Sequence, residues 1–293
     1  MFHLSDSIVN YFGVAPQGKV SLTYAIENSP LGTAGGVKAL EDDLKNTFVV
    51  CNGDIYTDLD LTEALRFHRQ KNAIATIVLT EVDDPSAYGM VETDSEGKIS
   101  RFLEKPSSDQ ITTNWINAGT YILEPEALGY APDAVSLMFE RDLFPTLLEN
   151  QQPVYSYKSD AYWIDVGSPQ NYKKLHDDIL LGNAPDNLRT TPISNGLIKG
   201  VGCKIAGDLR SFGPVLLGDS CVIGEKVELI GPLAIGDNCK IGAGVSISRS
   251  ILLDKVSVGE GSKVTGCVLG NRSSVREGSR ISSGTIIPED TIY

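Results

Sequence analysis

Hydrophobic positions in the first half of the chain follow the periods of strands and helices in turn. The apolar run from Thr47 to Cys51 predicts a strand, the pattern from Leu61 to Gln70 predicts a helix, and Ala73 to Leu79 predicts a second buried strand. Because this strand, helix, strand order is typical of parallel sheets, we expect an α/β fold with a mostly parallel sheet.

The next segments add a hairpin, a strand and two helices. Residues 88–94 and 98–106 flank the turn Ser95-Glu96-Gly97 and predict a β-hairpin. Asn117 to Leu123 predicts a further strand. Helical patterns cover Ser136 to Asn150 and Pro169 to Leu181, and the second begins with proline, whose missing N–H does no harm at a helix start.

The second half has a different period, in which an aliphatic residue recurs every six positions. The hexads run through Leu217, Ile223, Leu229, Ile235, Ile241, Ile247 and Leu253. The register slips by one between Leu253 and Val258 and again before Leu269, then resumes. This hexapeptide period predicts a parallel β-helix with three hexads in each triangular coil. We therefore expect three parts: a first domain at 1–182, a linker rich in Asn, Pro and Thr at 183–195, and a β-helix domain at 196–293.

Three cysteines support a coil of 18 residues. Cys203, Cys221 and Cys239 are spaced by 18, so they should stack on successive coils about 4.8 Å apart. We interpret them as a ladder of small core residues, although that spacing would also permit a disulfide. A repeat without histidine also lacks the general base that many hexapeptide acyltransferases use, because His3, His68 and His176 all precede it. The β-helix is therefore predicted to be structural or to mediate self-association.

Charge and hydropathy exclude several classes of partner. Residues 1–182 contain 27 Asp and Glu against 13 Lys and Arg, within a chain of net charge −13. Binding to nucleic acid is not expected, because it requires basic residues that displace counterions. No apolar stretch is long enough to span a membrane and the N-terminus has no signal-peptide pattern, so a cytoplasmic protein is predicted.

Two aspartates suggest the chemistry of the first domain. Asp54 and Asp165 each come just after an apolar run, and the carboxyl ends of strands form the ligand crevice of open α/β sheets. Each alone could equally be a turn or helix-cap residue. As a pair they suggest Mg²⁺, which proteins often hold with one or two carboxylates and substrate phosphates, and hence phosphoryl or nucleotidyl transfer.

Five motifs in order resemble one enzyme family. They are Pro30-Leu31-Gly32-Thr33-Ala34-Gly35-Gly36, Asn52-Gly53-Asp54, Phe102-Leu103-Glu104-Lys105-Pro106, Asn117-Ala118-Gly119 and Trp163-Ile164-Asp165-Val166-Gly167. With the hexapeptide repeat, the chain resembles the sugar-1-phosphate nucleotidyltransferases, above all the mannose-1-phosphate guanylyltransferase branch. The resemblance implies a Rossmann-like mixed, mostly parallel sheet followed by a left-handed β-helix.

The resemblance also implies roles for individual residues. Asp54 and Asp165 would hold Mg²⁺, and Lys105, held extended by Pro106, would contact the sugar phosphate. Nucleotide-binding positions would be Gly32, Thr33, Ala34, Gly35, Asn52 and Gly53. Sugar-binding positions would be Gly89, Glu104, Asn117 and Gly119.

One element of the family is missing from the 29 residues before Pro30, namely the glycine-rich loop that wraps the triphosphate. We therefore expect an N-terminally truncated sheet, from a truncated product or a misplaced start. The leading hypothesis is nucleotidyl transfer to a hexose 1-phosphate, with GTP and mannose 1-phosphate first and dTTP or UTP with glucose 1-phosphate next. The alternative is a non-catalytic subunit that binds sugar nucleotides, and a bifunctional uridylyltransferase and acyltransferase is disfavoured. Self-association through the β-helix is expected.

Overall fold

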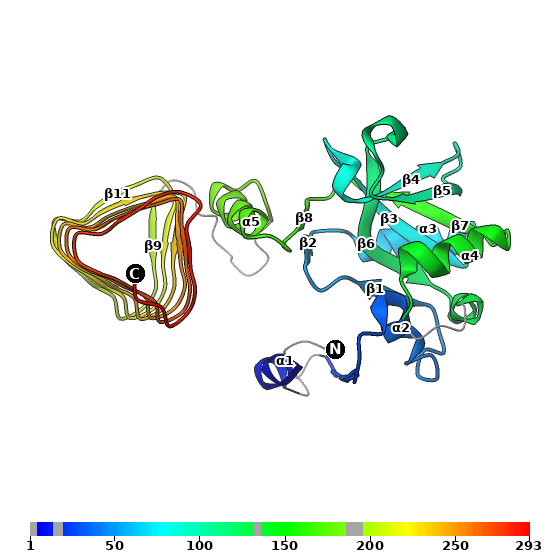
Figure 1. The fold of residues 1–293 in the computed structure, drawn as a ribbon, viewed down its shortest axis with the longest axis horizontal. Helices are drawn as coiled ribbons and strands as arrows, with labels where there is room; N and C mark the ends of the chain where they lie inside the picture. Colours follow the sequence, from blue (N-terminus) through cyan, green and yellow to red (C-terminus); the bar gives the residue numbers. More distant parts are fainter. Residues whose placement is uncertain (1–4, 14–19, 132–135, 186–195) are drawn as a thin grey trace. The chain divides into compact units, whose positions relative to one another are not determined.

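The computed structural model describes residues 5–13, 20–131, 136–185 and 196–293. Contacts divide the chain into two compact units, Met1–Trp163 and Ile164–Tyr293 (Figure 1). Helix α5 (Pro169–Leu181) therefore packs within the second unit, although it precedes the predicted boundary at residue 182. Compact units and domains are different divisions of a chain, so the predicted domain limits stay a prediction. Most of the predicted linker lies outside the described residues.

The first unit contains a six-stranded mixed sheet. Its strands are β1 (Phe48–Cys51), β3 (Ala75–Glu81), β4 (Gly89–Thr93), β5 (Ile99–Glu104), β6 (Trp115–Leu123) and β7 (Val154–Lys158). Strand β6 pairs antiparallel with β1, β3 and β4, and β7 pairs parallel with β3. Strands β1, β3, β4 and β7 therefore share one direction, which confirms the predicted α/β fold class. The predicted strand, helix, strand unit is parallel as expected, with β6 inserted between its two strands.

Short elements complete the first unit. They are α1 (Ser5–Phe12), α2 (Gly32–Lys38), β2 (Ile55–Thr57), α3 (Leu61–Lys71), η2 (Pro85–Ala87), η3 (Ser108–Gln110), η4 (Pro125–Tyr130), η5 (Phe139–Leu143) and α4 (Phe144–Glu149). The predicted helix at Leu61 begins where expected, because Asp60 accepts hydrogen bonds from the backbone N–H groups of Thr62 and Glu63. Among the described residues, no helix is long and apolar enough to cross a membrane.

Helix α3 is fixed to the sheet by a buried histidine. His68 is 1% exposed and hydrogen-bonds Thr76 on β3 through Nδ1, at 2.8 Å, and Glu124 through Nε2, at 3.1 Å. Since a carboxylate only accepts, Nε2 carries the proton and Nδ1 accepts from the threonine hydroxyl. Burial lowers the pKa of His68, which keeps the ring neutral.

The predicted helix from Ser136 to Asn150 starts later than expected. A π-helical turn, η5, begins at Phe139 and continues into α4. Leu137 cannot join the helix, because its N–H donates to Leu31 O at 2.7 Å and its carbonyl accepts from α2. Packing against α2 therefore overrides the local helical pattern.

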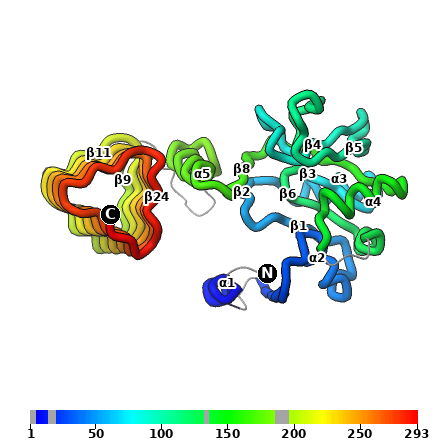
Figure 2. Tube along the Cα trace, viewed as in Figure 1, coloured from blue at the N-terminus to red at the C-terminus, as the bar shows by residue number. Residues whose placement is uncertain are grey.

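Three parallel sheets form the solenoid of the second unit, as its triangular outline in Figure 1 shows. One contains β9 (Leu197–Lys199), β12 (Val215–Leu217), β15 (Leu233–Ile235), β18 (Ile251–Leu252), β21 (Val268–Leu269) and β24 (Ile286–Ile287). The second contains β10 (Lys204–Ile205), β13 (Val222–Ile223), β16 (Lys240–Ile241), β19 (Ser257–Val258) and β22 (Ser274–Val275). The third contains β11 (Arg210–Phe212), β14 (Glu228–Ile230), β17 (Ser246–Ser248), β20 (Lys263–Thr265) and β23 (Arg280–Ile281). The predicted parallel β-helix is confirmed, and Figure 2 shows its coils stacked.

One detail of the predicted register is wrong. Leu252, not Leu253, is the inward residue, since it is 1% exposed and pairs with Ile235 one coil earlier. The slip therefore comes before Leu252, at the corner Arg249-Ser250, which has one residue fewer than the corresponding corner of the previous coil. The inward positions beyond it keep the six-residue period to Val264.

The cysteines form a core ladder, as we interpreted them, and the disulfide alternative is wrong because all five thiols are free. Cys221 and Cys239 are fully buried. The thiol of Cys221 donates to Gly236 O and that of Cys239 to Leu253 O, both at 3.1 Å, on the next coil. Each sulfur therefore fills the interior and links two coils.

Helix α5 covers part of one solenoid face. It begins and ends as predicted, because Ser168 accepts from Asn171 N at 3.1 Å and Gly182 ends it at a φ of 78°. Leu180 packs on Ala234, with Ile198 and Leu216 beside them. The strand before the helix, β8 (Trp163–Asp165), contains the unit boundary.

Candidate functional site

Strand β6 brings two of the predicted binding residues into contact. The N–H of Asn52, just after β1, donates to Gly119 O on β6 at 2.8 Å. Gly119 has a φ of 71°, and a Cβ at this position would lie 2.7 Å from Asn52 Nδ2. Glycine is therefore required here, both by its backbone conformation and by the Asn52 side chain that lies against it.

The hairpin of β4 and β5 pairs two further predicted residues. Gly89 lies opposite Glu104 in the register, and a Cβ on Gly89 would lie 2.8 Å from Glu104 Oε2. The Glu104 carboxylate is thus folded over the glycine. Burial raises the pKa of Glu104, and the negative charge of Glu140 raises it further, whereas Lys105 and Arg141 oppose this.

A hydrogen-bonded group on β6 includes one residue that sequence reasoning missed, Glu140 of η5. Asn117 Nδ2 donates to Tyr121 Oη at 2.8 Å and to Glu140 Oε1 at 3.3 Å, and the Tyr121 hydroxyl donates to the same oxygen at 2.8 Å. Asn117 Oδ1 accepts from Gly119 N at 2.9 Å. Burial raises the pKa of Tyr121, so its hydroxyl stays a donor. This group fixes the orientation of the predicted sugar-binding amide.

The predicted nucleotide loop is a helix start that packs on its own chain. A Cβ on Gly32 would lie 2.3 Å from Leu137 O, and the N–H groups of Ala34 and Gly35 donate to that oxygen at 2.9 and 3.1 Å. Thr33 is exposed, and its Oγ1 accepts from Phe139 N at 3.2 Å. Chain packing accounts for the glycines, and nucleotide contact by Gly32, Thr33, Ala34 and Gly35 stays a prediction.

Lys105 is exposed at the end of β5, and one expectation about it is wrong. Its backbone has a φ of 48°, in the left-handed region, and is not extended. The N–H of Lys105 donates to Tyr88 O at 2.9 Å, which extends the pairing of the hairpin by one residue before the buried Pro106. Few non-glycine residues adopt this conformation, and such residues are frequent at binding sites.

The two aspartates fall in different compact units, and the structure describes each by itself. Asp54 is exposed in the turn between β1 and β2, beside Gly53, which has open space around it. Asp165 is half-buried at the end of β8, and its Oδ1 accepts from Gly167 N at 2.7 Å. The turn role that we considered for a lone aspartate therefore applies to Asp165, and it leaves Oδ2 available.

The donor set suits Mg²⁺. Both groups are carboxylates, and Mg²⁺ is commonly held by one or two carboxylates together with waters and substrate phosphates. No group of three or more His, Cys, Asp or Glu side chains in the described part of the chain could hold a metal ion. Binding of Mg²⁺ by Asp54 and Asp165 together stays a prediction.

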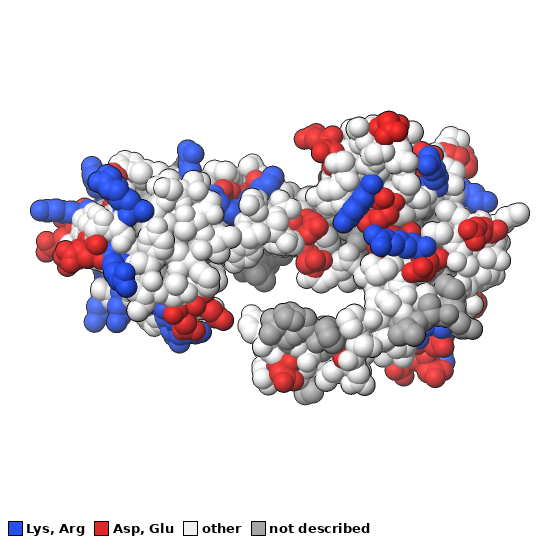
Figure 3. Space-filling model, in the orientation of Figure 1, with Lys and Arg blue, Asp and Glu red and all other residues white. Residues whose placement is uncertain are grey.

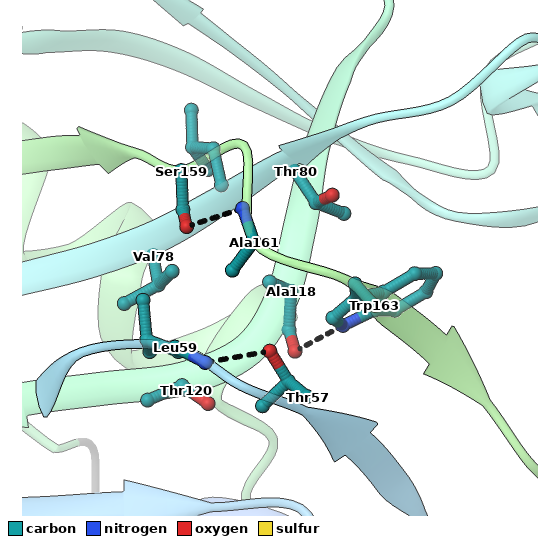
Figure 4. Close-up of a pocket in the computed structure, with 10 residues that line it drawn as sticks. Thr57, Leu59, Val78, Thr80, Ala118, Thr120, Ser159, Ala161 and Trp163 are labelled. Atoms are coloured by element: carbon teal, nitrogen blue, oxygen red, sulfur yellow. Dashed lines mark hydrogen bonds between the residues drawn. The ribbon is translucent and has the colours of Figure 1, made fainter. Parts of the chain in front are cut away.

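A small cavity beside β6 is too small for a substrate. Figure 4 shows its lining, with Val78 and Thr80 from β3, Ala118 and Thr120 from β6, and Trp163 from β8. Its volume is about 10 Å³, enough for roughly one water molecule. The indole Nε1 of Trp163 donates to Ala118 O at 2.9 Å. Trp163 therefore packs on β6 next to the predicted sugar-binding residues.

The charges of the first unit are mixed. On the face shown in Figure 3, Lys and Arg side chains lie among Asp and Glu side chains. Glu92 accepts from Thr112 Oγ1 at 2.6 Å and lies 3.6 Å from Arg101, and Lys71 lies 3.3 Å from Glu96. Such exposed pairs contribute little to stability, and the acidic surplus of the first half remains.

The chain thus combines a mixed α/β sheet, with a hydrogen-bonded polar group on strand β6, and a parallel β-solenoid. Residues 3–181 match the family model described as nucleotidyl transferase, and residues 211–292 match the GMPPB C-terminal domain. The chain belongs to the nucleotidyl transferase family. The resemblance to sugar-1-phosphate nucleotidyltransferases is thereby confirmed.

Several known proteins are similar to this chain. A UTP–glucose-1-phosphate uridylyltransferase of Synechocystis is 38% identical over 184 residues, which cover 58% of this chain and 47% of that protein. A mannose-1-phosphate guanylyltransferase of Mycobacterium tuberculosis is 36% identical over 176 residues, 59% of this chain and 48% of that protein. The chain spans about half the length of these curated relatives. The crystal structure of HddC from Yersinia pseudotuberculosis complexed with GMP-PN has a TM-score of 0.51 and 28% identity, covering 59% of this chain and 74% of that one.

Proposed function

We propose that this chain transfers a nucleotidyl group from a nucleoside triphosphate to a hexose 1-phosphate, with GTP and mannose 1-phosphate as its substrates. The observation that carries the proposal is the polar group around β6. Asn117, Glu104 and Glu140 offer hydrogen-bonding atoms, and Gly89 and Gly119 let the side chains of Glu104 and Asn52 lie close against the backbone beside them. Such an arrangement suits a hydroxyl-rich ring.

Each of the predicted site residues has its own role in the reaction. Lys105 contacts the sugar phosphate, whose oxygen attacks the α-phosphorus of the triphosphate while the bond to the bridging oxygen breaks and pyrophosphate leaves. Glu104 and Asn117 orient the sugar through its hydroxyls. Asp54 and Asp165 would hold Mg²⁺, which neutralises charge on the phosphates when bound.

The base and the sugar are tested together. Pyrophosphate release is measured for GTP, UTP and dTTP, each with mannose 1-phosphate and with glucose 1-phosphate, and the products are separated by anion-exchange chromatography. Fastest turnover with GTP and mannose 1-phosphate is expected. Turnover only with UTP and glucose 1-phosphate would favour the second substrate pair, which the Synechocystis relative supports by its name.

A binding subunit is the alternative to an enzyme. The observation that favours it is the self-packing of the predicted nucleotide loop, where two N–H groups are already bonded to Leu137 O. No turnover with any pair, together with calorimetric binding of GDP-mannose, would establish this alternative. Self-association through the solenoid remains our expectation, and sedimentation velocity of the chain tests it.

A further inference from the structure

Glu140 is a carboxylate with incomplete hydrogen bonding. Oε1 accepts from the Tyr121 hydroxyl and from Asn117 Nδ2, at 2.8 and 3.3 Å. Oε2 is buried, and no described residue donates a hydrogen bond to it. Buried carboxylate oxygens are almost always bonded, so an unpaired one calls for a donor that the chain itself does not supply.

The neighbours of Glu140 indicate what kind of donor fits. Glu104 lies near enough for the two negative charges to interact, and ionised carboxylates only accept hydrogen bonds. Lys105 and Arg141 act on the Glu104 carboxylate as positive charges, and both are exposed. Acceptors beside cations match a ligand that combines hydroxyl donors with a phosphate.

The position of Glu140 keeps it within reach of such a ligand. It is half-buried on η5, so the residue is partly exposed to solvent. Its partner Asn117 is a predicted sugar-binding residue, and Gly119 next to it has no side chain. The carboxylate therefore lies at the edge of the predicted sugar site.

Resting on the proposed function, we propose that Glu140 accepts a hydrogen bond from a ring hydroxyl of the hexose 1-phosphate and so helps to set which hexose is bound. The alternative is a brace that only orients Asn117. A brace acts on every sugar alike, whereas a direct acceptor is coupled to one hydroxyl of the ring.

The experiment uses Glu140→Gln, which keeps the size of the side chain and an oxygen for Tyr121. Binding of mannose 1-phosphate is measured by calorimetry on the whole chain, followed by its 2-, 3-, 4- and 6-deoxy analogues. We expect Glu140→Gln to bind mannose 1-phosphate about 10- to 100-fold more weakly, the usual effect of losing a hydrogen bond to a charged group. The exposed Glu126 supplies the control, since Glu126→Gln should leave binding unchanged.

The deoxy series separates the two roles. One analogue should bind the wild-type chain more weakly and lose nothing further with Glu140→Gln, which identifies the bonded hydroxyl. An equal additional loss for every analogue would overturn the inference in favour of a brace, and so would unchanged binding of mannose 1-phosphate by the variant. Both results leave the proposed function intact. A wild-type chain that binds neither mannose nor glucose 1-phosphate would refute the proposed function and the inference together.

Discussion

Replacing Gly32 by alanine places a methyl group where a backbone carbonyl already lies. The new Cβ would be 2.3 Å from Leu137 O and 2.9 Å from Leu137 C, at a φ of 77°. The left-handed conformation costs a non-glycine residue roughly 1–2 kcal/mol. Leu137 must also move, which weakens two hydrogen bonds to its carbonyl, each with a net value of about 0.5–1.5 kcal/mol. We therefore expect the first unit to lose about 2–5 kcal/mol of its free energy of unfolding.

Urea unfolding followed by tryptophan fluorescence measures this loss. Both tryptophans of the chain, Trp115 and Trp163, lie in the first unit, so the signal reports that unit alone. Gly53→Ala is the matched control, because it changes another predicted nucleotide-binding glycine that is exposed and has nothing within 4 Å of a new Cβ. Its effect should stay within about 0.5 kcal/mol.

Two results would refute the reasoning. An unchanged urea midpoint for Gly32→Ala would mean that Leu137 shifts without cost and that the close approach is not needed. Equal losses for Gly32→Ala and Gly53→Ala would mean that the close approach to Leu137 adds nothing to the cost of the new methyl group. A native stability of about 5–15 kcal/mol makes either outcome measurable.

Three further predictions concern other parts of the chain. Asp165→Asn keeps an oxygen for the Gly167 N–H, so we expect an unchanged urea midpoint but a loss of roughly 100-fold or more in Mg²⁺-dependent turnover, and unchanged turnover would remove Asp165 from the mechanism. Because burial lowers the pKa of His68, the unfolded state binds its proton first as the pH falls, so the first unit should lose stability below about pH 6.5. Urea midpoints at pH 7.5 and 5.5 should differ less in His68→Gln than in the wild type, and an equal difference would contradict this. In thiol titration the exposed Cys51 should react in the folded chain, whereas Cys221, Cys239 and Cys267 should react only after unfolding, and fast reaction of all five would contradict the core ladder.

The solenoid could be predicted almost completely from the sequence, because each coil repeats the same local rule. The one error in the predicted register of the solenoid has a local cause. Leu252 and Leu253 are identical in size and hydropathy, so the six-residue period cannot tell which one points inward. The length of the corner at Arg249-Ser250 decides, and corner length depends on how two coils pair, which a single hexad does not reveal.

The first unit was predictable where contacts are local. The turn at 95–97 predicts the hairpin, whereas the pairing of Gly89 with Glu104 also depends on a register shift between Glu92 and Thr93. The late start of η5 was not predictable, because the segment before it is held by hydrogen bonds to Leu31, Ala34 and Gly35, which lie about a hundred residues earlier. Helix propensity is a local property, so it does not reflect partners that are so distant in the sequence.

Glu140 gave one signal that could have been used. In the helical pattern it lies three, four and seven residues before Leu143, Phe144 and Leu147, so a carboxylate occupies the stripe that faces the core. A charged residue in such a place is seldom buried without a partner. The pattern could therefore have indicated a buried carboxylate with hydrogen-bond partners. It could not have shown that Asn117 and Tyr121 are those partners.

The segment from Leu137 to Glu140 connects the two predicted parts of the site. Leu137 O holds the start of α2, and three residues later Glu140 holds Asn117 and Tyr121 on β6. Displacing Leu137 must therefore disturb the sugar-side carboxylate as well as the nucleotide loop. It follows that Gly32→Ala, although Gly32 is not a predicted sugar-binding residue, should weaken mannose 1-phosphate binding, and that Gly53→Ala should not. If sugar binding survives the loss of stability in Gly32→Ala, the two halves of the site are independent and Glu140 is positioned by β6 alone.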